Sequence, residues 1–147
     1  MHHAYRIIIA EDDGILATLL VRLILRRYPT AVIQAFGNGQ DAVAAYDQAG
    51  ADLLFVNHGM PGMDGPTMIR MLRARGDSVP IIGMSGNPWL HDEYIAAGAM
   101  VFVEGWELIE QLSALLQRFL PPTPGSVDHA ARERTVPTQY PPEASGT

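Results

Sequence analysis

The amino-acid sequence predicts a doubly wound α/β domain, in which a five-stranded parallel sheet carries helices on both faces. Two observations lead to this prediction. Short apolar runs, most of them rich in β-branched residues, alternate with longer segments of helical periodicity, and this alternation continues over most of the chain. Strands that are joined through crossover helices lie parallel, and right-handed crossovers leave few topologies. A doubly wound sheet is the simplest of them.

Five strands and five helices make up the predicted series. The strands are expected at Tyr5–Ala10, Ala31–Ala35, Leu53–Asn57, Val79–Met84 and Met100–Val103. The helices are expected at Ile15–Arg27, Gln40–Ala49, Pro66–Arg75, Pro88–Ala97 and Glu107–Phe119. Leucines recur at helical spacing in the first of these helices, and the proline that opens the third suits a first helical turn.

The composition argues against several classes of function. The formal net charge is −6, so the chain lacks the basic surface that binds nucleic acid or an anionic membrane. There is no cysteine, which excludes disulfides, thiolate metal sites and thiol redox chemistry. The N-terminal segment has acids directly after a short apolar run and is neither a signal peptide nor a spanning helix. We therefore expect a cytoplasmic protein with neither nucleic acid nor membrane as a direct partner.

The chain divides into a domain over residues 1–120 and a proline-rich tail or linker over residues 121–147. Six of the eleven prolines fall in that tail, which has too few apolar residues to fold alone. We expect the tail to be flexible, with a short helix near Val127–Arg134 as an open alternative. No output domain follows the predicted domain in this sequence, so we expect another chain, or a part lost from the C-terminus, to carry the output.

Candidate functional residues come at the carboxyl ends of the predicted strands, where open α/β sheets form their binding crevices. Paired carboxylates after the first strand suit a hard cation such as Mg²⁺, which takes oxygen ligands. The alternative is that these acids cap the first helix and offset its dipole. The strand-end residues are Glu11, Asp12, Asp13, Asn57, Ser85, Glu104, Gly105 and Trp106.

Several separate stretches of the sequence together match one known pattern. They are IIIAEDDGILATLL, NGQDAVAAY, DLLFVNHGMPGMDG, PIIGMSG and GAMVFV. With them, the chain from about Tyr5 to Leu120 resembles the receiver domain of bacterial two-component response regulators. The resemblance implies a flavodoxin-like fold with strand order 2-1-3-4-5. It also implies a role in phosphorelay signal transduction, in which a partner histidine kinase transfers a phosphoryl group to an aspartate at the end of the third strand.

The resemblance also assigns roles to particular residues. Glu11 and Asp12 stand at the Mg²⁺-binding acidic pair, Ser85 at the hydroxyl position and Phe102 at the aromatic switch position. The phosphoacceptor position, however, is Asn57, and the lysine position is Gly105. The sequence thus predicts an atypical receiver.

These two departures remove the chemistry of the family at the positions that make and sense the phosphate. The amide of Asn57 is no carboxylate nucleophile, and all ten basic residues are arginine, so no lysine can substitute. We assign no catalytic residue and expect no enzymatic activity. Glu11, Asp12, the Asn57 side-chain oxygen and the Gly59 carbonyl remain a weak Mg²⁺ candidate, because replacing a carboxylate by an amide lowers the ligand charge.

The remaining candidates have plainer explanations. His58 is expected to be a loop histidine, Asp64 to cap the third predicted helix, and the Ser85 hydroxyl to bond local backbone. The resemblance places an aromatic group around the fourth helix, fifth strand and fifth helix, the face that receivers use for dimerisation and output. Core packing explains some of this group equally well, and for Phe102 it is the preferred explanation. The group comprises Trp89, Tyr94, Phe102 and Trp106.

Three hypotheses for function follow. The first is a degenerate receiver that acts through contacts with a histidine kinase or output protein, or as a homodimer, without its own phosphorylation. The second keeps phosphorylation on another acid, such as Asp12 or Asp13. The third is a small-molecule-binding flavodoxin-like protein. It is disfavoured because the crevice is acidic and the sequence has no G-x-G-x-x-G loop.

Overall fold

The computed structural model describes residues 4–122 and confirms the doubly wound sheet. All pairings between the described strands are parallel, and the strand order is β2-β1-β3-β4-β5. The strands are β1 (Arg6–Ala10), β2 (Val32–Phe36), β3 (Leu53–Asn57), β4 (Ile81–Ser85) and β5 (Val101–Glu104). The helices are α1 (Gly14–Arg27), α2 (Gly39–Ala49), α3 (Gly65–Ala74), the 3-10 turn η1 (Pro88–Leu90), α4 (His91–Ala97) and α5 (Gly105–Phe119).

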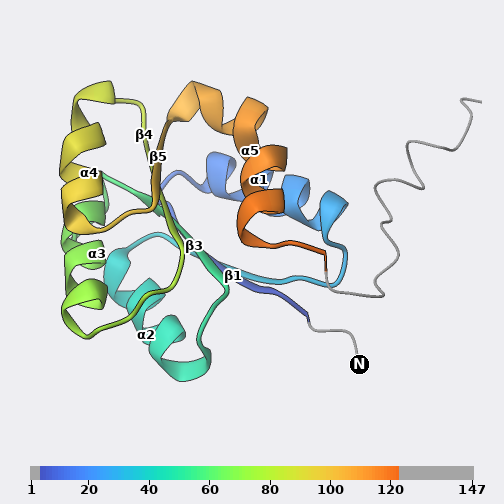
Figure 1. Ribbon diagram of the computed structural model, residues 1–147, viewed down its shortest axis with the longest axis horizontal. Helices are drawn as coiled ribbons and strands as arrows, with labels where there is room; N and C mark the ends of the chain where they lie inside the picture. Colours follow the sequence, from blue (N-terminus) through green and yellow to red (C-terminus); the bar gives the residue numbers. More distant parts are fainter. Residues whose placement is uncertain (1–3, 123–147) are drawn as a thin grey trace, which may run out of the picture.

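The helices form two layers, one on each face of the sheet. Helices α1 and α5 cover one face, whereas α2, α3 and α4 cover the other (Figure 1). Alternate residues of β1 point to opposite layers: Ile7 and Ile9 join the cluster under α1 and α5, and Ile8 and Ala10 join the other. The inner strands are buried on both faces, which explains why they are almost continuously apolar in sequence.

Most predicted elements lie within one or two residues of the observed ones, and the differences have local causes. Strand β4 begins at Ile81 and not at Val79. Pro80 has no N–H to donate, although its carbonyl accepts a hydrogen bond from Leu54 at 3.0 Å. The predicted helix Pro88–Ala97 was wrong in its first turn, which is the separate 3-10 turn η1, capped by the Asn87 side chain.

Three polar side chains fix where helices begin. The carboxylates of Asp13 and Asp64 and the amide of Asn38 accept hydrogen bonds from backbone N–H groups in the first turns of α1, α3 and α2, respectively. Asp64 accepts from the Thr67 N–H at 2.8 Å, and hydrogen bonding by Thr67 lowers the pKa of Asp64. The predicted cap of the third helix is therefore confirmed.

Two tyrosines, one just before β1 and one just after α1, bond the chain at the end of α5. The hydroxyl of Tyr28 donates to the Leu120 carbonyl at 2.6 Å, and the hydroxyl of Tyr5 donates to the Pro121 carbonyl. The predicted tail lies outside the described residues from position 123 onward, so the division into domain and tail stays a prediction. No helix in the described part of the chain combines the length and apolar character needed to cross a bilayer.

Candidate functional site

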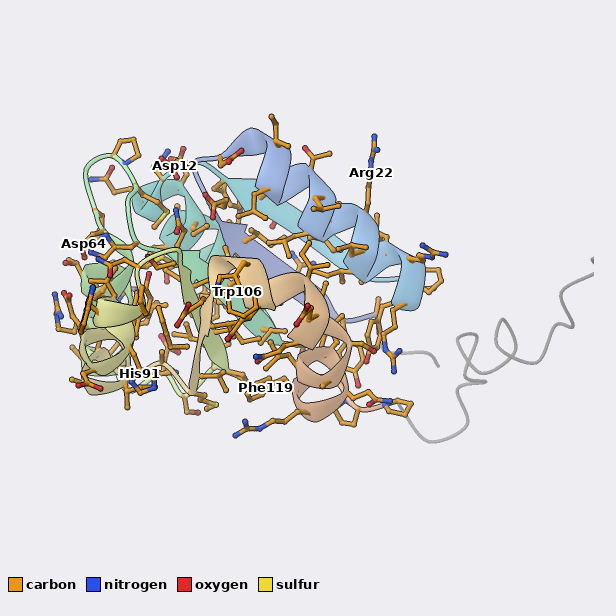
Figure 2. The ribbon with its side chains drawn as sticks, turned by 90° about the horizontal axis from the view of Figure 1, so that it is seen from above. Asp12, Arg22, Asp64, His91, Trp106 and Phe119 are labelled. Atoms are coloured by element: carbon orange, nitrogen blue, oxygen red, sulfur yellow. The ribbon has the colours of Figure 1, made fainter. Side chains whose placement is uncertain are left out.

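The carboxyl ends of the strands meet at one edge of the sheet, and this edge gathers the strand-end residues. In Figure 2, Asp12 lies at the turn between β1 and α1, Asp64 in the loop before α3, and Trp106 in the first turn of α5. The fold brings together at this edge the ends of four strands, with the residues Glu11, Asp12, Asn57, Ser85 and Gly105.

The Asn57 side chain joins the two acids that follow β1. Its amide nitrogen donates to Glu11 Oε1 at 3.0 Å and to Asp12 Oδ1 at 3.1 Å. The N–H groups of the amide, and not its oxygen, therefore face the acidic pair, and one carboxyl oxygen of each acid serves as the acceptor. Asn57 therefore meets the two acids as a hydrogen-bond donor.

Glu11 is the most constrained acid of the site. It is buried, and its Oε1 accepts from the Asp13 N–H at 3.0 Å as well as from Asn57, whereas Oε2 is buried without a hydrogen-bond partner. Burial raises the pKa of Glu11 to about 7, and the neighbouring carboxylates of Asp12 and Asp13 act in the same direction. The Asn57 amide is therefore a main source of polar contact for a carboxylate removed from water.

The three consecutive acids after β1 have different roles. Asp13 Oδ1 accepts from the backbone N–H groups of Ile15 and Leu16, at 2.9 and 3.2 Å, so this carboxylate caps α1. Asp12 is exposed and bonds Asn57. The capping explanation for the acids thus holds for Asp13, while Asp12 and Glu11 face Asn57.

The hydroxyl and lysine positions present little to an anion. The Ser85 hydroxyl is largely buried and accepts from the Asn87 N–H at 3.1 Å, a local backbone contact. Gly105 opens α5 without a side chain, and the carboxylate before it, Glu104, accepts from the Trp106 indole at 3.0 Å. Gly105 therefore stands at the lysine position and Trp106 at the position that follows it, with the Glu104 carboxylate directly before them.

The loop after β3 folds back on itself. The His58 carbonyl accepts from the N–H groups of Met60 and Gly65, both at 3.1 Å, and Gly59 is exposed.

Among residues 4–122, no group of three or more His, Cys, Asp or Glu side chains is placed to hold a metal ion. The donor set implied by the resemblance fits a cation poorly, because Asn57 turns its N–H groups toward the acids.

The aromatic group splits between core and surface. Trp89 and Trp106 are exposed, at 88% and 67%, whereas Tyr94 is fully buried, so core packing, one of the two explanations left open by the sequence, holds for Tyr94. Phe102 is half-buried and packs on the core, as preferred. Sequence reasoning did not decide between core and surface for Tyr94; an available signal was Gly83 inside a strand, which marks a close approach by a neighbour.

This topology, with an acidic pair after β1 and polar residues ending β3 and β4, defines the receiver class of α/β signalling domains. The chain belongs to the response regulator receiver domain family, whose model matches residues 7–117. It is therefore a receiver domain of the kind found in two-component response regulators.

Known proteins agree with this membership. The chain is 31% identical over 118 residues to the sensory transduction protein RegX3 of Mycolicibacterium smegmatis, covering 76% of this chain and 50% of that one. It is 32% identical over 120 residues to the two-component response regulator PhoP of Pseudomonas aeruginosa, covering 77% and 52%. It thus spans about half the length of these relatives. The chemotaxis protein CheY4 of Vibrio cholerae shares the fold, with a TM-score of 0.71 at 20% identity over 80% of this chain and 100% of that chain.

The contact between Asn57 and the acids gives a direct test on stability. Replacing Asn57→Asp removes the donor amide and adds a third carboxylate beside Glu11 and Asp12, so we expect the free energy of unfolding in EDTA to fall by about 1–3 kcal/mol. Urea unfolding measures it. Gln48→Glu, the same chemical change on the exposed surface of α2, is the control and should cost less than about 0.5 kcal/mol. Equal losses in both variants would contradict the role given to Asn57.

Proposed function

We propose that this chain is a degenerate receiver that takes part in two-component signalling through protein–protein contacts independent of its own phosphorylation. The observation that carries the proposal is the pair of hydrogen bonds from the Asn57 amide to Glu11 and Asp12. Receiver domains interact with histidine kinases and output domains, and we expect a partner of this kind in the cytoplasm. The proposal makes the chain a binding module and not an enzyme.

The chemistry of the site supports this reading. An aspartyl phosphate needs a carboxylate nucleophile, and the Asn57 amide nitrogen shares its lone pair with the carbonyl. The transferred phosphoryl group also needs positive charge nearby. The position that would supply it is Gly105, positions 98–117 hold no arginine, and the chain holds no lysine.

Phosphorylation of another acid has weaker support. The Asp13 carboxylate is engaged with two backbone N–H groups at the start of α1. Asp12 is exposed, but its carboxylate accepts a hydrogen bond from Asn57. The lysine that would bind a phosphoryl group is also missing, because Gly105 stands at its position. Neither acid has a basic side chain bonded to it in the described part of the chain.

A small-molecule site has one observation in its favour. A surface hollow of about 430 Å³ lies beside α1 and the end of β2, lined by Ala17, Val21, Arg22, Ala35 and Phe36, with Glu11 and Asp12 at one end. The acidic end disfavours an anionic cofactor. The hollow is shallow and shows no nucleophile paired with a base, so we place binding of a protein partner first.

The contact face we propose surrounds the edge strand β5. Exposed apolar side chains gather on the elements next to this strand, and aromatic residues are enriched among interface anchors. Figure 2 shows Trp106 at the start of α5. We define this β5 face by Trp89, Ile95, Met100, Trp106 and Ile109, all exposed to more than a third of their area. A homodimer through this face is one form of the proposal.

Magnesium binding should be weak or absent. The amide contributes no charge, and its N–H groups occupy the acceptors that a cation would take. Isothermal titration with MgCl₂ should show little heat for the natural chain, whereas Asn57→Asp should bind at least about tenfold more tightly. Tight uptake by the natural chain would overturn this prediction.

Phosphorylation itself is tested with acetyl phosphate and Mg²⁺, or with beryllofluoride. We expect no phosphoryl adduct in the intact-mass spectrum of the natural chain and no shift of its amide resonances with beryllofluoride. The positive control is the double variant Asn57→Asp with Gly105→Lys, which should gain binding at least in part. A stable adduct on the natural chain would sink the proposal and favour phosphorylation of another acid.

The β5 face is tested by sedimentation over a range of protein concentrations. If the face forms a homodimer, the natural chain should associate, and Trp89→Ala with Trp106→Ala should weaken association by at least about tenfold, as expected for aromatic anchors. Ile15→Ala is the matched control, because Ile15 is 85% exposed on α1 and lies outside the face. A chain that stays monomeric throughout would exclude the homodimer and leave a different partner for this face.

A further inference from the structure

Tyr94 connects helix α4 to the carboxyl ends of β3 and β4, next to Asn57 and Ser85. Its side chain is fully buried, and its hydroxyl donates to the Val56 carbonyl at 3.1 Å, with the Met84 carbonyl 3.5 Å from the same oxygen. These carbonyls belong to the residues directly before Asn57 and Ser85. Burial raises the pKa of Tyr94, so the hydroxyl keeps its proton and remains a donor at all ordinary pH values.

The space that Tyr94 fills is left by two glycines. A methyl group at Gly83, in the middle of β4, would overlap the Tyr94 ring. A methyl group at Gly65, at the start of α3, would overlap the Tyr94 hydroxyl and the Asn57 carbonyl. Because no side chain stands at either position, a full tyrosine fits between the sheet and α3, and no room remains for a second large group.

Phe102 packs on the outer side of this tyrosine. The two ring centroids are 5.1 Å apart with an interplanar angle of 40°, and the His91 ring meets Phe102 edge-on at 5.8 Å. Phe102 stands at the aromatic switch position and is half-buried. Tyr94 therefore fills the interior next to Phe102, while His91, in the first turn of α4, contacts Phe102 edge-on.

We propose that Tyr94 is a lock that holds α4 and Phe102 in one arrangement. The conformation of the β5 face then stays the same when the surroundings of Asn57 and Ser85 change. The lock rests on the proposed function, since it explains how a receiver could present one constant face without phosphorylation. Tyr94 contacts the backbone of β3 and β4 and fills the interior beside Phe102. These contacts fix the positions of α4 and Phe102 relative to the ends of the two strands.

The packing part of the lock is tested by a double-mutant cycle. Gly83→Ala should lower the urea midpoint strongly, because its methyl group collides with the Tyr94 ring, and Tyr94→Ala should lower it by opening a cavity. Together, the two changes should cost clearly less than the sum of the single losses, since each relieves the other. As a control, Gly83→Ala with Tyr46→Ala, a half-buried tyrosine on α2, should be additive. Additive losses for Gly83→Ala and Tyr94→Ala would show that the two residues do not pack against each other and would contradict the lock.

The hydrogen bond is tested with Tyr94→Phe, which keeps the ring and removes only the hydroxyl. Amide hydrogen exchange within α4 and at Ala99 should become about 2- to 10-fold faster, the factor expected for one lost hydrogen bond, while exchange in α1 should not change. Tyr46→Phe, which removes a hydroxyl bonded to Asp77, should leave α4 unchanged. Unaltered exchange in α4, or an equal acceleration in α1, would contradict the lock.

The position of Phe102 gives the last readout. Relaxation dispersion on labelled phenylalanine should detect a single Phe102 state in the natural chain and exchange with a second, inward state in Tyr94→Ala. A single Phe102 state in both the natural chain and Tyr94→Ala would show that Tyr94 does not restrict Phe102. None of these measurements involves phosphate or a partner, so their failure would leave the argument from Asn57 intact. Conversely, an adduct with acetyl phosphate would sink the proposed function without touching the packing of Tyr94.

Discussion

The hydrogen bonds from the Asn57 amide to Glu11 and Asp12 are the contact on which the functional edge depends. Two carboxylates placed together, one of them buried, repel each other and lose hydration, and a donor or a cation must offset that cost. Here one neutral amide supplies both donors from within the chain. The amide thus bonds both acids, and in the function we propose the same residue takes the place of the nucleophile and of the cation.

This edge is supported from beneath by the packing of a single aromatic side chain. Tyr94 reaches from α4 to the carbonyl of Val56, the residue before Asn57, and fills space that glycines leave open on β4 and α3. Helix α4 has only seven residues, and since short helices are marginal in isolation, it depends on tertiary contacts of this kind. The buried Tyr94 side chain therefore links α4 directly to the end of β3 that carries Asn57.

The aromatic residues near β5 fall into two populations with different consequences. Tyr94 and Phe102 stabilise the interior, whereas Trp89 and Trp106 stand in solvent. Contiguous exposed apolar patches mark sites of association, which is why the two tryptophans enter the contact face that we propose. This division between buried and exposed aromatic residues is compatible with the constant contact face that we propose.

The sequence by itself determined the order and nature of the elements, the capping role of Asp64, and the identities of Asn57 and Gly105, because periodicity, turn chemistry and residue type are local properties. The direction of the Asn57 amide, the separation of Asp13 from Glu11 and Asp12, and the burial of Tyr94 were decided only by the tertiary structure. Each depends on residues far apart in the chain. Strand register brings Asn57 to Glu11 across 46 positions, and the seven residues of α4 are too few for a periodic pattern to reveal which side faces the core.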